Sequence, residues 1–302
     1  MTLQSFHPSR RKLWLAAVKP PMYSVAIMPI LVGSAIAYAE TGRFDPGVFG
    51  AFLAAAILIL AWENLSNDVF DAVTGIDINK PHSVVNLTRN RPLVFALANL
   101  CLLVGLVAMV AISLRQQDAT VLGLIALCCG LGYLYQGPPF RLGYQGLGEI
   151  LCFLSFGPLG LGAAYYSQTQ SWSWASQLAA AVIGLTTTLV LFCSHFHQVE
   201  DDIAAGKRSP IVRLGTERGA QLVPWLCGGV FSLTGLGLGL GLFPRATLLV
   251  LASGLPAWRL SQHLQRHHHQ PDRVSNAKFY ALGFHFWSGL LLALGFWLSR
   301  LG

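Results

Sequence analysis

Charged residues are scarce in this chain. Of its 302 residues, only 11% are Asp, Glu, Lys or Arg, whereas 54% are hydrophobic. An ordinary soluble domain carries roughly 25% charged residues. The polar surface that remains is too small to coat a globule in water, which argues against a soluble enzyme, a disordered chain and a secreted disulfide scaffold.

Several common site signatures are also missing. The six cysteines lie in apolar stretches without C-x-x-C or zinc spacing, which favours a packing role for Cys101, Cys128, Cys129, Cys152, Cys193 and Cys227. The GxxxxGK[ST] phosphate loop is absent, and the GLGLGLG stretch at 235–241 has no strand-turn-helix context. No Ser-His-Asp or Cys-His arrangement indicates a nucleophilic enzyme. The chemistry must therefore come from other residues.

Long uncharged runs are abundant instead. About 20 apolar residues cross the roughly 30 Å hydrocarbon core of a bilayer as a helix. The sequence predicts nine such spans, at about 21–39, 46–63, 92–114, 119–136, 148–166, 177–195, 221–242, 246–262 and 279–299. No low-complexity linker divides the chain. We therefore expect an all-α integral membrane protein, a bundle of about nine transmembrane helices forming a single domain over residues 1–302.

The basic residues are distributed unevenly among the loops. With nine spans and a cytoplasmic N-terminus, four of the 20 Lys and Arg face outside (Arg43, Arg115, Arg245 and Arg300), which leaves 16 on the cytoplasmic side. Cytoplasmic loops are normally enriched in Lys and Arg. The net charge of +7 is thus explained by topology and by attraction to anionic membrane lipid, and we expect no nucleic-acid partner.

Acidic residues gather in two of the predicted cytoplasmic loops. Eight of the 13 lie there, namely Glu63, Asp68, Asp71 and Asp77 after the second span and Glu200, Asp201, Asp202 and Glu217 after the sixth. Solvated loops with no specific task would share their acids more evenly. The clustering therefore indicates a site.

The first acidic segment continues the second span out of the membrane. Asn67, Asp68 and Asp71 have the i,i+3 and i,i+4 spacings of one helix face. Gly75 suits the C-cap of that helix, after which the chain can return Asp77 toward the same face. Oxygen ligands without cysteine or histidine suit Mg²⁺, whose coordination is commonly completed by phosphate oxygens and water.

The second acidic segment repeats this arrangement with basic residues added. His195, Gln198 and Asp202 fall on one helix face, and Lys207 and Arg208 follow at once. These two bases can bind an anion beside a metal. Two acidic helix ends repel each other unless a cation and a polyanion lie between them. Together the segments predict a site for Mg²⁺ and a diphosphate.

The acidic motifs resemble those of the UbiA-type intramembrane aromatic prenyltransferases. The pattern Asn67-Asp68-x2-Asp71-x5-Asp77 is followed by Asp202, 131 residues after Asp71. The resemblance covers nearly the whole chain. The Gly75 and Gly206–Lys207 turns and the stretch at 143–149 are similar to the branch that acts on 1,4-dihydroxy-2-naphthoate. The stretches at 84–89 and 195–219 are similar to its cyanobacterial members that transfer phytyl.

The resemblance implies a reaction and a set of roles. An Mg²⁺-dependent enzyme would transfer a prenyl group, here phytyl, from an allylic diphosphate to 1,4-dihydroxy-2-naphthoate with loss of CO₂ and diphosphate, in phylloquinone or menaquinone synthesis. Asp71 and Asp202 would be catalytic. The implied metal ligands are Asn67, Asp68, Asp71, Asp77, Asp201 and Asp202. The candidate substrate contacts are Tyr135, Arg141, Lys207, Lys80, His195 and Gln198.

One departure and several alternatives remain at this point. Gln198 stands where the family usually has a carboxylate, so Glu200 or Asp201 could replace it as a ligand. The acceptor could instead be homogentisate, 4-hydroxybenzoate or a chlorophyllide, and the different class is a cation-coupled transporter. We expect the site to face the cytoplasm from a bacterial plasma membrane or a thylakoid. Asp71 and Asp202 are placed at the membrane boundary, so neutralising either one is expected to spare folding.

Overall fold

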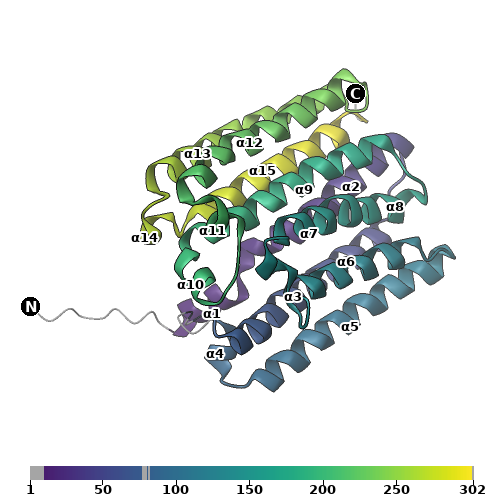
Figure 1. Cartoon of the computed structure of the whole chain (residues 1–302). Helices are drawn as coiled ribbons and strands as arrows, with labels where there is room; N and C mark the ends of the chain where they lie inside the picture. The colour runs from purple at the N-terminus through teal and green to yellow at the C-terminus, as the bar shows by residue number, and fades with distance from the viewer. Residues whose placement is uncertain (1–9, 77–79, 81, 301–302) are drawn as a thin grey trace, which may run out of the picture.

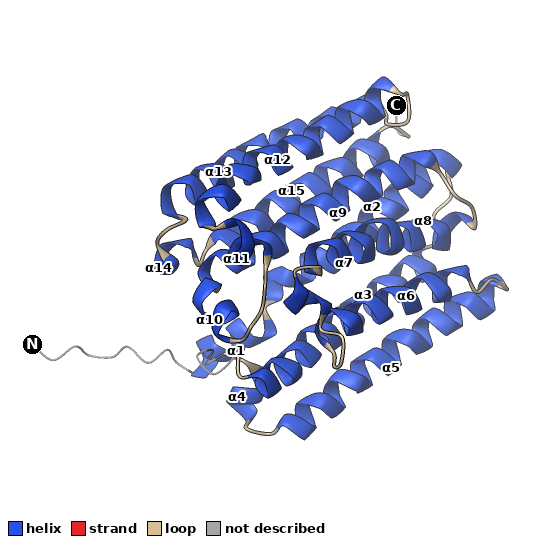
Figure 2. Cartoon of the chain, viewed as in Figure 1, coloured by secondary structure: helices blue, strands red, loops and turns tan. Residues whose placement is uncertain are grey.

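The computed structural model describes residues 10–76, 80 and 82–300, and within them every regular element is helical (Figure 2). The first half contains α1 (Arg10–Val18), η1 (Pro20–Tyr23), α2 (Ser24–Thr41), α3 (Pro46–Thr74), α4 (Val84–Thr88), α5 (Arg91–Gln116), α6 (Thr120–Gln136), η2 (Leu142–Gln145) and α7 (Gly148–Leu154). The second half contains η3 (Ser155–Leu161), α8 (Gly162–Thr169), α9 (Trp174–Ser194), η4 (His195–His197), α10 (Val199–Ala204), α11 (Pro210–Leu214), α12 (Thr216–Gly239), η5 (Arg245–Ser253), α13 (Gly254–His267), α14 (Pro271–Val274) and α15 (Ala277–Leu298).

The long helices lie side by side in one bundle (Figure 1). Seven helical segments of the described residues are long and apolar enough to cross a membrane: Arg10–Thr41, Pro46–Thr74, Arg91–Gln116, Gly148–Thr169, Trp174–His197, Thr216–Gly239 and Pro271–Leu298. The shorter α6 is also apolar, and the expected range 246–262 falls on η5 and α13. The chain is a multi-pass membrane protein, and the exact total of nine spans remains a prediction.

Helix α3 is longer than a bilayer core requires. It starts where the side chain of Asp45 accepts hydrogen bonds from the backbone N–H groups of Gly47 and Val48, at 2.9 and 3.0 Å. It ends after 29 residues at Gly75, which takes the left-handed conformation with φ 80°, as the sequence predicts. A helix of that length measures about 43 Å. Its last turns, which carry the first acidic segment, can therefore extend beyond the hydrocarbon core.

Small residues let the central helices approach closely. A Cβ atom added at Gly33 of α2 would lie 2.8 Å from the carbonyl oxygen of Leu161, and one at Gly157 would lie 2.6 Å from that of Ala180. Close backbone contact through glycine is a common means of holding membrane helices together. The six cysteines are all free and lie on the apolar helices α5, α6, α7, α9 and α12, in agreement with a packing role.

One end of the bundle collects the short elements. Figure 1 shows α1, α4, α10 and α14 together at this end. The second acidic segment does not simply continue α9, because the three-residue helix η4 separates α9 from α10, with Gln198 between them. The ends of α3, α6 and α9 reach the same region, so the fold gathers polar side chains from distant parts of the sequence.

Candidate active site

A cavity of about 910 Å³ opens at this end of the bundle, and both acidic segments line it. Asn67 and Asp71 face it from α3, while Gln198, Asp201 and Asp202 face it from the second segment. Its deeper wall is apolar and includes Leu60, Leu151, Phe156 and Val190. The cavity therefore offers a polar end for a charged head and an apolar part for a hydrocarbon chain.

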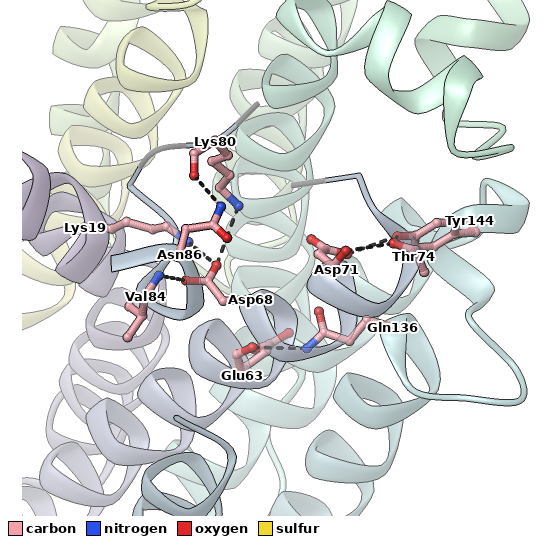
Figure 3. Close-up of polar contacts among 10 residues, drawn as sticks. All are labelled: Lys19, Glu63, Asp68, Asp71, Thr74, Lys80, Val84, Asn86, Gln136 and Tyr144. Atoms are coloured by element: carbon pink, nitrogen blue, oxygen red, sulfur yellow. Dashed lines mark hydrogen bonds and ion pairs between the residues drawn. The ribbon is translucent and has the colours of Figure 1, made fainter. Parts of the chain in front are cut away.

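Asp71 is held by groups from its own helix and from the segment after α6. The hydroxyl of Tyr144 donates to Oδ1 of Asp71 at 3.0 Å and also lies 2.8 Å from the hydroxyl of Thr74 (Figure 3). Burial, followed by the charge of Asp71, raises the pKa of the Tyr144 phenol. The phenol therefore stays protonated and acts as a donor. This bond orients the Asp71 carboxylate, and the Asp71 side chain lines the cavity.

Asp68 points to a different place from Asp71. Its carboxylate accepts a hydrogen bond from the backbone N–H of Val84 at 2.7 Å and lies 3.6 Å from Lys80 Nζ and 3.8 Å from Lys19 Nζ (Figure 3). Asn67 and Asp71 line the cavity, whereas Asp68 is buried behind it. The structure thus divides the three predicted ligands of one helix face into two groups. The fourth predicted ligand, Asp77, lies outside the described residues.

Asp202 is fully buried between two basic groups. Lys207 Nζ lies 3.2 Å from its Oδ1, and His195 Nδ1 lies 3.3 Å from its Oδ2. The other ring nitrogen of His195 is 3.3 Å from Oε1 of Glu149, which opens α7. Burial alone would raise the pKa of Asp202, but the hydrogen bond from His195 and the charge of Lys207 outweigh it and lower that pKa. Asp202 therefore remains a carboxylate at neutral pH.

Tyr144 also connects the two acidic segments. Its ring lies 5.9 Å from Lys207 Nζ, and its carbonyl accepts a hydrogen bond from the N–H of Arg208 at 2.8 Å. The neighbouring Gly146 has φ 80°, and a Cβ there would lie 2.6 Å from the Arg208 carbonyl. The loop around Tyr144 is therefore fitted against the loop that carries Lys207.

Two glycines of the 143–149 stretch allow a further close contact, with the ring of Tyr135. A Cβ at Gly143 or Gly148 would lie 2.7 or 2.6 Å from the ring of Tyr135. Tyr135 lines the cavity, so these two glycines provide the space for its ring. The pattern that supports the family resemblance is thus explained by packing around Tyr135 and Tyr144.

The remaining predicted site residues are distributed as follows. Lys80, His195, Gln198 and Lys207 line the cavity together with Tyr135. Arg141 does not line it and takes a left-handed conformation with φ 44° at the start of η2. Glu200 is exposed and does not line the cavity, whereas Asp201 does. Of the two proposed replacements for the missing carboxylate, only Asp201 is in position.

Sequence reasoning missed several cavity residues. Tyr144 was recognised only as part of a resembling motif, and Lys19 and Lys278 only as charges that mark topology. Lys19 lies in a left-handed turn between α1 and η1, and Lys278 in the first turn of α15. Both line the cavity with Lys80 and His82. Their separation in the sequence gave no signal that they would meet.

The donors at the polar end fit a magnesium ion shared with a phosphate. Among the described residues, no three His, Cys, Asp or Glu side chains form a closed metal site. Asn67, Asp71 and Asp201 nevertheless direct oxygen-bearing side chains into one cavity. Mg²⁺ is commonly held by one or two carboxylates, with substrate phosphates and water completing its shell. A site in which protein groups supply only part of the metal's coordination shell is therefore what Mg²⁺ bound together with a phosphate requires.

Comparison with known proteins agrees with this geometry. Residues 26–298 match the UbiA prenyltransferase family. The chain is 55% identical over 98% of its length to the 2-carboxy-1,4-naphthoquinone phytyltransferase of Synechocystis, covering 96% of that protein. It is 43% identical over 96% of its length to the chloroplastic Arabidopsis thaliana protein of the same name, covering 78% of it. A 1,4-dihydroxy-2-naphthoate octaprenyltransferase of Escherichia coli is 31% identical over 68% of this chain and 70% of its own length.

Solved structures show the same fold. A UbiA homolog from Archaeoglobus fulgidus superposes with a TM-score of 0.63 at 16% identity, covering 96% of this chain and all of that one. The homolog has also been solved bound to GPP and Mg²⁺, and that structure superposes with a TM-score of 0.59, again at 16% identity, over 96% of this chain and all of that one.

Proposed function

The chain belongs to the UbiA prenyltransferase family, and from that premise we propose that it transfers phytyl from phytyl diphosphate to 1,4-dihydroxy-2-naphthoate, releasing diphosphate and CO₂. The observation that carries the proposal is the meeting of Asn67 and Asp71 with Asp202 and Lys207 in one cavity that has a deep apolar wall. A diphosphate with a long hydrocarbon chain matches both parts of that cavity. A cation-coupled transporter would not need the apolar wall beside the charges.

The names of the relatives support the acceptor class. Two of them name the oxidised 2-carboxy-1,4-naphthoquinone, and one names the reduced 1,4-dihydroxy-2-naphthoate. An allylic cation is attacked by an electron-rich ring carbon, and the two hydroxyl groups of the reduced form donate electrons to that ring. A quinone ring is electron-poor. We therefore assign the reduced 1,4-dihydroxy-2-naphthoate as the reacting acceptor, and phytyl as the group that the donor transfers to it.

The polar end of the cavity is suited to stabilise the leaving group. Mg²⁺ bound by Asn67, Asp71 and Asp202, with Asp201, would neutralise the charge that develops on diphosphate as the C–O bond breaks. Lys207 lies beside Asp202 and adds a positive charge at the same place. Tyr144 fixes the orientation of the Asp71 carboxylate through its hydroxyl. The electron pair of the broken bond leaves with diphosphate.

The apolar wall protects the cation from water. Phe156 and Val190 belong to it, and they would contact the hydrocarbon chain of the donor. The ring carbon that carries the carboxylate forms the new C–C bond. Its bond to the carboxylate then breaks, the electron pair returns to the ring, and CO₂ leaves. No side chain has to remove a proton from the ring carbon, because CO₂ leaves from that carbon instead.

We further propose that residues 1–302 act as one domain with the cavity open toward the cytoplasm. The family match over residues 26–298 supports one domain. The charge distribution supports the orientation, because only four of the 20 Lys and Arg lie in the opposite loops. Accessibility of single cysteines placed in the 267–276 loop to a membrane-impermeant thiol reagent, in spheroplasts and in inverted vesicles, tests the orientation.

Product mass spectrometry tests the reaction. Purified protein is given Mg²⁺, phytyl diphosphate and, in separate reactions, reduced 1,4-dihydroxy-2-naphthoate, homogentisate, 4-hydroxybenzoate or a chlorophyllide. We expect a phytylated, decarboxylated naphthohydroquinone from the first acceptor only. Replacing phytyl diphosphate by an octaprenyl diphosphate should lower the rate. A product from another acceptor, with none from the naphthoate, would refute the assignment.

A further inference from the structure

A second group of basic side chains lines the cavity, apart from Lys207. We call Lys19, Lys80 and Lys278 the lysine cluster; His82 lies among them. Lys80 and Lys19 approach Asp68 at 3.6 and 3.8 Å (Figure 3). Burial, followed by the charges of Lys80, Lys278 and Lys19, lowers the pKa of His82 to about 4. His82 is therefore neutral at physiological pH and can be a hydrogen-bonding neighbour, while the lysines supply the charge.

The cluster is assembled from three distant parts of the chain. Lys19 stands in a left-handed turn with φ 51° and ψ 52° between α1 and η1, Lys80 follows the first acidic segment, and Lys278 lies in the first turn of α15. Among the described residues Lys278 makes no ion pair, and its ammonium group lies 5.3 Å from the ring of Phe279. Bringing like charges together in a partly buried place costs free energy. Asp68 offsets part of that cost for Lys19 and Lys80, and an anionic ligand in the cavity would offset it for Lys278 as well.

The proposed reaction needs two anions in one cavity. Diphosphate requires oxygen ligands for a metal together with a base, and Asp71, Asp202 and Lys207 provide them. The lysine cluster differs, because Asp68, the carboxylate that pairs with Lys80 and Lys19, does not itself line the cavity. Apolar side chains border the cluster, namely Leu15, Met22 and Phe279. Ammonium groups beside an apolar wall match a flat aromatic ring that carries a carboxylate.

We propose that the lysine cluster binds the carboxylate of the aromatic acceptor and places its ring against Leu15, Met22 and Phe279. The proposal rests on the proposed function, since it assumes an aromatic carboxylate as substrate. Anchoring this group fixes the adjacent ring carbon, which is the one that must face the allylic cation. It also gives the site a means to prefer acids over neutral naphthols.

Equilibrium binding of a non-reacting analogue tests the cluster without Mg²⁺ or turnover. The probes are 1-hydroxy-2-naphthoate and its uncharged counterpart 1-hydroxy-2-naphthamide, added to full-length protein in detergent and followed by fluorescence. We expect Lys278→Gln to weaken acid binding about tenfold and to leave amide binding unchanged. Lys12→Gln is the matched control, because Lys12 lies on α1 and does not line the cavity. Equal weakening of both probes, or no change in either, would overturn the proposal.

Steady-state kinetics with a second variant separates the cluster from the diphosphate site. Lys278→Gln and Lys19→Gln should each raise the KM for 1,4-dihydroxy-2-naphthoate about tenfold and leave the KM for phytyl diphosphate within twofold. A raised donor KM with an unchanged acceptor KM would assign the cluster to diphosphate and refute the inference. If the wild-type protein turns over a different acceptor and not the naphthoate, the proposed function fails instead. In that case the binding assay still tests whether the lysine cluster binds an aromatic carboxylate, because the assay needs no turnover.

Discussion

Replacing Asp202 by asparagine should cost stability as well as activity. The sequence suggested that Asp202 lies at a hydrated boundary, where neutralisation would spare the fold. The structure instead places it at 0% exposure, between Lys207 at 3.2 Å and His195 at 3.3 Å. The side chains of these partners are themselves only 11% and 4% exposed. Asparagine would leave one buried ammonium group without its counter-ion.

The expected magnitude follows from this burial. Removing one partner of a buried ion pair typically costs 3–5 kcal/mol, because the remaining charge is poorly solvated. We expect about 3 kcal/mol here, since Lys207 retains some contact with the cavity. Because the pKa of Asp202 is lowered in the folded protein, the stabilisation from this pair is present at neutral pH. It is lost as the pH falls through the lowered pKa.

The assay is thermal unfolding in detergent, followed by size-exclusion chromatography of the heated samples. Asp202→Asn should unfold at a clearly lower temperature than the wild type, and its turnover should fall by a factor of about 10² or more because a leaving-group ligand is lost. Adding Lys207→Met should restore much of the stability, since the uncompensated charge is gone, without restoring turnover. Two results would refute this reasoning: an Asp202→Asn variant that unfolds at the wild-type temperature, or a double variant with Lys207→Met that unfolds at a lower temperature than Asp202→Asn alone.

Three further outcomes are expected. Chelation by EDTA should abolish turnover and added Mg²⁺ should restore it, and full turnover in thoroughly chelated protein would contradict the oxygen-ligand site. Asp71→Asn should lower turnover by a factor of about 10² or more with little change in unfolding temperature, because Tyr144 can still donate to the amide oxygen; near-normal turnover would remove Asp71 from the site. Gln198→Asp should lower the Mg²⁺ concentration for half-maximal rate and Asp201→Asn should raise it; titrations of both variants identical to the parent would show that neither side chain contacts the metal.

The spans could be predicted because the bilayer imposes a simple length and composition rule on each helix. Each of the nine expected ranges falls on a helical segment of the structure. The C-cap at Gly75 was also predictable, since a left-handed turn favours glycine. The range 246–262 is the one whose span is hardest to assign, because it falls on η5 and α13, a run of mixed 3₁₀ and α geometry whose second part is interrupted by polar residues.

The site was only partly accessible to sequence reasoning. Spacing alone grouped Asp68 with Asp71, but residues three apart point about a sixth of a turn away from each other around a helix. In the structure the Asp68 carboxylate accepts a hydrogen bond from the backbone N–H of Val84. The role of Tyr144 depends on how its loop folds onto the end of α3. Lys19 and Lys278 come together because η1, which follows Lys19, packs beside α15, which begins next to Lys278. Such tertiary contacts leave no periodic trace in the sequence.

The two-part cavity would make the proposed reaction a case of phase-transfer catalysis. In that reaction the charged end would take up a small acid from water, while the apolar wall would take up a chain that is dissolved in lipid. The effective concentration of the donor is therefore its mole fraction in the surrounding membrane or micelle, and diluting it with inert lipid lowers occupancy at constant total amount. The proposed product carries neither the carboxylate of the acceptor nor the diphosphate of the donor, so it would partition into the bilayer rather than into water.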